Sequence, residues 1–183
     1  MAGRLRFPAL LAATLAVTAG TAYAQQSTRA VQQVPDNIAP HPAPAQPVQF
    51  SHQTHSAAGL QCEACHTRPP PGEQMTFPAA SLCMSCHAAI ASDRPSIARL
   101  AELAASDQEI PWVRVYEMSP GITWSHSAHL DAGLQCTACH GDVAQLSEMA
   151  MTTAVTAMAS CISCHQAHET DAACQTCHAW PAE

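Results

Sequence analysis

The sequence predicts a fold made mainly of loops and short α-helices, with little or no sheet. Only 4% of the 183 residues are aromatic, so large side chains cannot easily fill a core. Helical spacing of apolar residues marks a short stretch that begins after Asp93, a possible N-cap, and ends near Ser106. All ten cysteines lie in short repeated motifs, so we expect a bound group to supply the missing apolar bulk.

Residues 1–24 have the layout of a secretory signal peptide. Arg4 and Arg6 precede an apolar run that ends near Gly20, and Ala22-Tyr23-Ala24 forms a small-x-small cleavage site. The run is shorter than the roughly 20 residues that a membrane-spanning helix needs. We expect cleavage after Ala24 and a periplasmic location for the rest of the chain, with retention as an uncleaved anchor as the alternative.

The next segment, residues 25–47, is rich in Pro, Gln and Ala and has no periodic apolar residues. This composition is typical of an extended linker, so we expect a Pro-rich tether in which His41 is solvated. From Val48 on, the chain repeats itself. Residues 50–66 return 74 positions later as residues 124–140, with eleven of seventeen positions identical, which indicates a duplicated unit.

Five copies of Cys-x-x-Cys-His carry the chemistry of the chain. In this motif the two thiols add to the vinyl groups of a haem, and the His that follows binds the iron from one side as the proximal ligand. The copies, numbered here as sites 1 to 5, are Cys62/Cys65/His66, Cys83/Cys86/His87, Cys136/Cys139/His140, Cys161/Cys164/His165 and Cys174/Cys177/His178. The sequence therefore predicts five covalently attached haem c groups.

Zinc and disulfides are the rival interpretations of these cysteines. Zinc takes four protein ligands in a structural site, so pairing the motifs leaves one of the five unmatched. Disulfides suit an exported protein, but they leave the five motif histidines without a role. Iron–sulfur clusters do not require a His after every second Cys. Haem accounts for all of these residues.

A second axial ligand closes a haem iron, and the histidines outside the motifs are the candidates for this distal position. His52/His55 and His126/His129 form two His-x-x-His pairs, each shortly before a motif, where two imidazoles can reach two different irons. For the fifth iron the candidates are His168 and Met158, with an open iron as the remaining possibility. The choice matters because a thioether ligand raises the reduction potential of a haem relative to a second imidazole.

The motifs divide the chain into a two-haem module at residues 48–109 and a three-haem module at residues 110–183. Within the second module, residues 110–116 are expected to be extended, and Pro120-Gly121 is expected to turn the chain into the second repeat. After removal of residues 1–24 the chain has five Arg, no Lys and fourteen Asp and Glu. This acidity argues against nucleic acid as a partner and favours a redox protein with a basic docking face.

The His-x-x-His pairs before Cys-x-x-Cys-His resemble the class III multihaem cytochromes, in which packed haems replace a conventional core. A closer likeness covers about Val48 to His168 and points to the pentahaem subunit of alternative complex III and related quinol-oxidising membrane complexes. The segments that carry it are Leu82-Cys-Met-Ser-Cys-His87, Ile110-Pro-Trp-Val-Arg-Val, His126-Ser-Ala-His129, Cys139-His-Gly141 and Met158-Ala-Ser-Cys-Ile-Ser-Cys-His165. The resemblance implies an electron conduit and, since that family has a Met at the place of Met158, a possible thioether ligand. For this chain, with its cleavable signal, peripheral association with a membrane is a further possibility.

Three functions fit these observations. The first is an electron carrier that is not an enzyme, in which five six-coordinate haems connect two redox partners. The second is a multihaem reductase of nitrogen or sulfur oxyanions, whose open iron would be the one at His178. The third is a structural or filament subunit with stacked haems, in which His41 of the tether ligates a haem of a neighbouring copy.

Overall fold

The computed structural model describes residues 34–37 and 41–179. The signal peptide predicted at residues 1–24 and a large part of the tether predicted at residues 25–47 lie outside the described residues. The helical elements are α1 (His52–Ala57), η1 (Cys62–Ala64), α2 (Ala80–His87), α3 (Pro95–Ala105), α4 (His126–Asp131), α5 (Cys136–His140), η2 (Val143–Gln145), α6 (Met158–Ala167) and α7 (Cys174–Cys177). Within the described ranges, extended pairing is limited to isolated bridges between Asp36 and Thr153 and between Ile122 and His178. The predicted fold of loops and short helices is confirmed.

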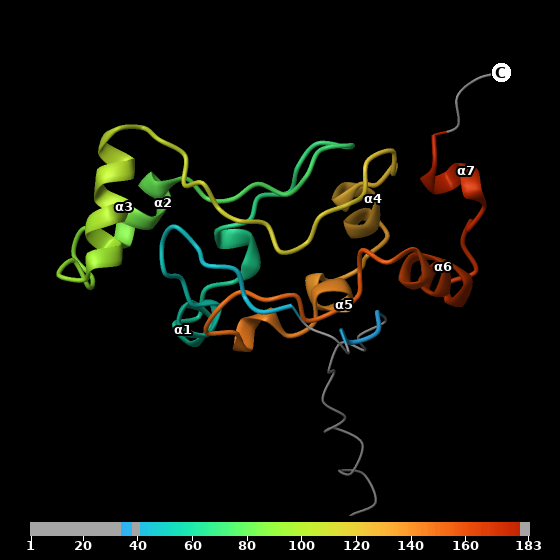
Figure 1. Cartoon of the computed structure of the whole chain (residues 1–183), viewed down its shortest axis with the longest axis horizontal. Helices are drawn as coiled ribbons and strands as arrows, with labels where there is room; N and C mark the ends of the chain where they lie inside the picture. Colours follow the sequence, from blue (N-terminus) through green and yellow to red (C-terminus); the bar gives the residue numbers. More distant parts are fainter. Residues whose placement is uncertain (1–33, 38–40, 180–183) are drawn as a thin grey trace, which may run out of the picture.

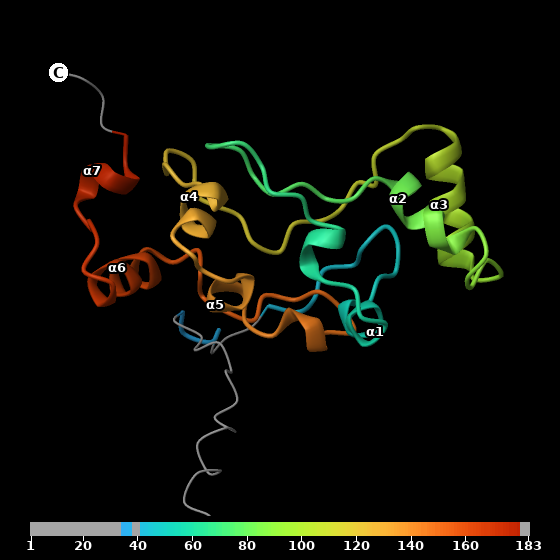
Figure 2. The ribbon, with the colours of Figure 1, turned by 180° about the vertical axis from the view of Figure 1, so that it is seen from behind.

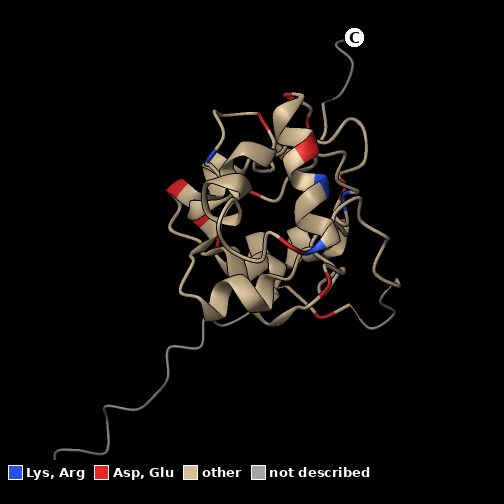
Figure 3. Ribbon diagram, turned by 90° about the vertical axis from the view of Figure 1, so that its left-hand side faces the viewer, with Lys and Arg blue, Asp and Glu red and all other residues tan. Residues whose placement is uncertain are grey.

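The elements are spread along the long axis of the molecule. Figures 1 and 2 show α2 and α3 at one end and α6 and α7 at the other, with α1, α4 and α5 between them. Figure 3, which looks along this direction, shows the helices distributed around the view and charged residues scattered among them. In the part of the chain that the structure describes, no helix is both long and apolar enough to cross a membrane.

The duplicated segments form matching short helices. Helix α1 begins after Ser51, whose side-chain oxygen accepts a hydrogen bond of 3.2 Å from the backbone N–H of Thr54 and so caps the helix. It ends before Gly59, which has a φ of 87°, a left-handed conformation that glycine adopts without strain. Gly133, with a φ of 84°, follows α4 in the same way. These stops place each His-x-x-His pair on one helical turn just before a haem-attachment motif.

A small apolar cluster lies at the end of the molecule that holds α2 and α3. Helix α3 buries Ile97, Leu100 and Leu103 against α2, and Val48 and Ile110 complete the cluster with Ala80. The helix begins at Pro95, because the fixed φ of proline suits the first helical position, so its N-cap is Arg94 and not the expected Asp93. Its end agrees with the prediction, since Ser106 is the C-cap.

Direct contacts join the two predicted modules. The backbone N–H of Gln53 in α1 donates a 2.9 Å hydrogen bond to the carbonyl of Leu146 beside η2. Arg68 forms a salt bridge with Asp131 and donates a 3.2 Å hydrogen bond to the carbonyl of Ser127. Helix α1 and the residues just after site 1 are therefore held against α4 and the residues beside η2.

Parts of the segment expected as a tether also contact the body of the protein. The N–H of Asn37 donates to the carbonyl of Thr152, and the N–H of Ala154 donates to the carbonyl of Pro35, each at 3.0 Å. Further along, the side chain of Gln46 hydrogen bonds with both the carbonyl and the N–H of one backbone residue, Val113, at 2.9 and 3.0 Å. These contacts hold residues 34–37 and 46 against the second half of the chain.

Candidate haem sites

Four of the predicted distal histidines each face a proximal histidine. The ring centres are 6.5 Å apart for His52 and His66, 6.0 Å for His55 and His87, 6.3 Å for His126 and His140, and 6.2 Å for His129 and His165. The four separations fall within half an ångström of one another, although the two rings of each pair come from different segments of the chain. Each distal imidazole of one His-x-x-His pair faces a different motif.

These separations match the spacing that one metal ion imposes on two imidazoles. A ligating nitrogen lies about 2 Å from the metal, and the ring centre about 1 Å behind the nitrogen, so two rings on opposite sides of an iron are about 6 Å apart. Rings in direct contact would be closer. The residues at sites 1 to 4 therefore fit haem groups with two imidazole ligands each.

Backbone carbonyl groups orient many of these imidazoles. Because a carbonyl can only accept, the ring Nδ1 in each contact is the donor, which leaves Nε2 for a metal. The donors and acceptors are His55 to Ser51 at 2.8 Å, His66 to Thr76 at 3.2 Å, His87 to Ile90 at 2.8 Å, His129 to Ser125 at 2.8 Å and His165 to Asp171 at 2.6 Å. Both sides of sites 2 and 4 are held in this way.

An aromatic residue orients the first histidine of each pair. The Nδ1 atoms of His52 and His126 are buried and have no hydrogen-bond partner among the described residues. The ring of Phe50 stands edge-on to His52, with centres 4.9 Å apart and planes at 87°, and Trp124 stands edge-on to His126 at 4.0 Å and 81°. Each of these imidazoles is therefore held by a T-shaped ring contact and not by a carbonyl acceptor.

The same two rings also stack on the second histidine of each pair. Phe50 lies 4.5 Å from His55 at 21°, and Trp124 lies 5.8 Å from His129 at 26°. Sequence reasoning missed these two residues as part of the site. The signal was an aromatic residue two positions before the first His in both copies of the repeat, and it became interpretable only with the ring geometry.

Burial keeps several of the imidazoles in the neutral form that binds metals. Burial, followed by the neighbouring His140, His129 and Arg114, lowers the pKa of His126 to about 4. Burial and then His66 and His55 lower the pKa of His52, and burial followed by His66 lowers the pKa of His140. The nitrogen lone pairs at sites 1 and 3 are therefore available to a metal at neutral pH.

The ten attachment cysteines differ in exposure, although all of them occur in the same sequence motif. None of the ten forms a disulfide; Cys62, Cys86 and Cys174 are exposed, and the other seven are partly buried. At site 2 both kinds occur on one helix. Cys83 packs against the apolar cluster between α2 and α3, whereas Cys86, one turn later on α2, is exposed, and the Ser85 hydroxyl lies 3.9 Å from its Sγ. The predicted haem of site 2 would therefore be attached by one partly buried thiol and one at the surface.

The thiols of different sites lie close enough to affect one another. Burial raises the pKa of the Cys136 thiol first, and Cys62, which is also its hydrogen-bond partner, raises it further. The pKa of Cys83 is likewise raised by burial and then by Cys65. Site 1 therefore neighbours both site 3 and site 2.

The remaining sites continue this sequence of neighbours. Burial raises the pKa of Cys139, with further contributions from Cys164, Cys161 and Cys136. Burial also raises the pKa of Cys161, followed by Cys177. Site 4 therefore lies between site 3 and site 5, and the five attachment segments follow one another in the order 2, 1, 3, 4, 5.

Site 5 is held against the start of the second repeat. Its motif forms α7, and His178 pairs with Ile122 in an isolated bridge, next to a 2.7 Å hydrogen bond from the N–H of Thr123 to the carbonyl of Cys177. Of the two distal candidates, Met158 is the first residue of α6 and is 66% exposed, whereas His168 is the C-cap of the same helix. The fifth distal ligand stays a prediction.

Two family models match the chain in consecutive segments. Residues 27–100 match the class III cytochrome c family, and residues 122–179 match cytochrome c7 and related cytochromes c. The chain is a multihaem cytochrome c. Its resemblance to class III cytochromes is confirmed by these matches, each of which contains a His-x-x-His pair followed by attachment motifs.

One relative is named as a subunit of a menaquinone reductase. The cytochrome is 36% identical over 112 residues to a protein named menaquinone reductase, multiheme cytochrome c subunit, from Nitratidesulfovibrio vulgaris. The aligned part is 54% of this chain and 53% of the relative, so the cytochrome spans about half the length of that protein.

Proposed function

We propose that this cytochrome holds five haem c groups and carries electrons between two redox partners in the periplasm. The observation that carries the proposal is the set of four imidazole pairs with ring centres 6.0 to 6.5 Å apart. Haem supplies a one-electron centre whose potential depends on its axial ligands, burial and nearby charge. The side chains at sites 1 to 4 supply two imidazoles each, which leaves no coordination position there for a substrate.

The neighbour order of the attachment segments supports a linear path. Sites 2 and 5 are the two ends of the order 2, 1, 3, 4, 5, and their helices α2 and α7 lie at opposite ends of the long axis (Figure 1). Electrons would enter at one of these ends and leave at the other. Sites 1 and 3, one from each repeat, form the junction in the middle.

A quinone-linked membrane complex is the partner that we propose. The relative is named as a subunit of a menaquinone reductase, and the segments noted above resemble the pentahaem subunit of alternative complex III. The chain would bind such a complex peripherally, from the periplasmic side, after removal of residues 1–24. Its acidic composition favours a basic docking face.

Spectroscopy of the purified holoprotein tests the five-haem proposal. We expect a mass that includes five haems, only low-spin iron in the EPR spectrum of the oxidised protein, and no optical change when carbon monoxide is added to the reduced protein. A high-spin signal with carbon monoxide binding to about one haem in five would contradict the proposal. It would favour the reductase alternative and direct attention to the iron at His178.

Fractionation and N-terminal sequencing test the location and the partner. We expect a mature N-terminus at Gln25 in the periplasmic or membrane fraction. Solubilised membranes should yield the cytochrome together with an activity that oxidises a quinol or reduces a quinone. Recovery of the whole protein from the cytoplasm with Met1 retained would refute the export proposal. Salt should weaken the association, because charged surfaces guide the docking.

A further inference from the structure

Residues 110–116, the segment expected to be extended, include part of the family resemblance but supply none of the proposed iron ligands. The structure shows that this segment runs past both sites of the central junction. The ring centre of Trp112 lies 6.4 Å from that of Phe50, which contacts both distal imidazoles of the first repeat. The ring centre of Tyr116 lies 4.9 Å from that of His140 at site 3. Both backbone polar groups of Val113 are hydrogen bonded to the side chain of Gln46. Val113 before Arg114 and Tyr116 after it are therefore both held by contacts with other parts of the protein.

Arg114 places a positive charge between sites 1 and 3. Its guanidinium carbon lies 4.7 Å from the centre of the Phe77 ring, a cation–π contact. The centre of that ring is 6.4 Å from the His66 ring of site 1. On the other side, the chain reaches site 3 two residues after Arg114, where the centre of the Tyr116 ring lies 4.9 Å from that of His140.

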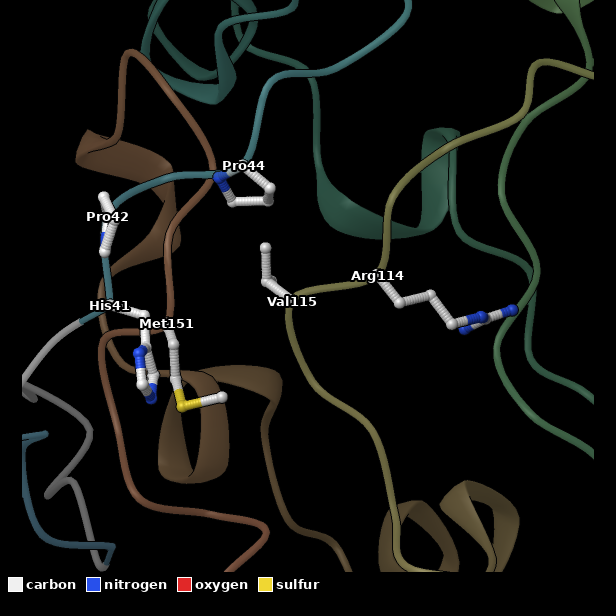
Figure 4. A pocket seen from close by; sticks show the side chains of 6 residues that line it. All are labelled: His41, Pro42, Pro44, Arg114, Val115 and Met151. Atoms are coloured by element: carbon white, nitrogen blue, oxygen red, sulfur yellow. The ribbon is translucent and has the colours of Figure 1, made fainter.

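Arg114 forms no salt bridge among residues 34–37 and 41–179, where the salt bridges are Arg68 with Asp131 and Arg99 with Glu102. Arg114 also borders a hollow that is otherwise lined by His41, Pro42, Pro44, Val115 and Met151. Figure 4 shows its side chain extending away from His41 and Met151. The guanidinium group therefore lies outside the space between the prolines, Val115 and Met151.

We propose that Arg114 binds haem propionates where the groups of sites 1 and 3 meet, and that its charge raises the reduction potential at this junction. The proposal rests on the haem sites proposed above. A guanidinium group binds carboxylates through two parallel hydrogen bonds at its edge. The flat face of the Arg114 guanidinium packs on the Phe77 ring, which leaves that edge for a carboxylate. A positive charge favours the reduced state, because reduction adds an electron near it. The transfer of electrons between the two repeats would depend on this residue.

Redox titration of purified Arg114→Gln holoprotein, followed optically, tests this inference. We expect the reduction equilibrium constant of one or two haems to fall about tenfold, which corresponds to about 59 mV for a one-electron couple. The other potentials should stay within the error of the titration. The EPR spectrum should remain that of the wild type, because Arg114 ligates no iron.

Arg99→Gln is the matched control. It removes the same charge from an exposed arginine that is paired with Glu102 at 3.0 Å on α3. Potentials that shift equally in Arg114→Gln and Arg99→Gln, or that shift in neither, would overturn the inference.

Arg114→Lys keeps the inference testable if Arg114→Gln is not produced with its haems. Lysine retains the charge, so its potentials should remain close to those of the wild type, and a tenfold fall in this variant would also overturn the inference. The proposed function fails separately, by high-spin iron or a haem count below five in the unaltered protein.

Discussion

Replacing His129 with Ala should open one haem iron, the one at site 4. The His129 ring lies 6.2 Å from that of His165, and its Nδ1 donates a 2.8 Å hydrogen bond to the carbonyl of Ser125. Alanine removes the distal imidazole but leaves the proximal ligand and both cysteines of the site. The haem stays attached, and its iron becomes available to an added ligand.

The magnitude follows from the number of attachment motifs. One open iron among five should give a carbon monoxide difference spectrum about one fifth as large as that of the same protein after denaturation has released every distal ligand. In the EPR spectrum, one low-spin signal should be replaced by one high-spin signal. The other three histidine pairs involve separate rings, so their signals should persist.

Optical spectra of the reduced variant with and without carbon monoxide provide the assay, and His41→Ala is the control. His41 lines the hollow beside Met151 and faces none of the motif histidines in the contacts described above, so its removal should leave every iron closed. Carbon monoxide binding by His41→Ala, or an unchanged low-spin spectrum in His129→Ala, would refute the assignment of distal ligands.

Three further predictions concern the residues around the haems. Trp124→Leu should broaden the EPR signals of sites 3 and 4 alone, because the ring orients both distal imidazoles of that repeat; a spectrum identical to the wild type would exclude this role. Leu100→Ala should lower the free energy of unfolding of the α2–α3 end by about 2 to 5 kcal/mol, measured by denaturant titration. A loss below about 1 kcal/mol would mean that the haems, and not the apolar cluster, stabilise this end. Asp171, whose pKa is lowered by hydrogen bonds from the Thr176 hydroxyl and the Ala173 N–H, should stabilise α7 at neutral pH. Asp171→Ala should therefore speed amide exchange in α7 at neutral pH. The difference should disappear as the pH falls through the lowered pKa, because the wild-type carboxylate is then protonated. Equal exchange rates at neutral pH would contradict this stabilising role.

The absence of long elements could be predicted from composition, and the location of α3 from its apolar spacing. The prediction that α3 starts after Asp93 was wrong. Aspartate is the better capping residue, but Pro95 suits the first helical position, so Arg94 is the N-cap. The attachment motifs are local, so spacing alone identifies them. Spacing does not show which thiols are exposed, because the packing of α2 on α3 decides that Cys83 is covered and Cys86 is not.

Pairing the histidines required the structure. His55 and His87 are 32 positions apart in the sequence, and only the turn of α1 and the path of the intervening loop bring their rings to 6.0 Å. The order of the sites is also invisible in the sequence, because site 1, and not site 2, lies next to site 3. The order of the sites in space differs from their order in the sequence because the two repeats are in contact through sites 1 and 3, the first motif of each.

The pairing of residues 34–37 with residues 152–154 bears on how the protein matures. These segments are more than 110 positions apart, and such a contact forms late because the chain must first close a long loop. In the export proposed above, the N-terminal segment would emerge first, and its partners, residues 152–154, would follow the motifs of sites 1 to 3. The attachment of haem at these three sites can therefore proceed on an open chain, and the N-terminal segment closes over it only once residues 152–154 have been delivered.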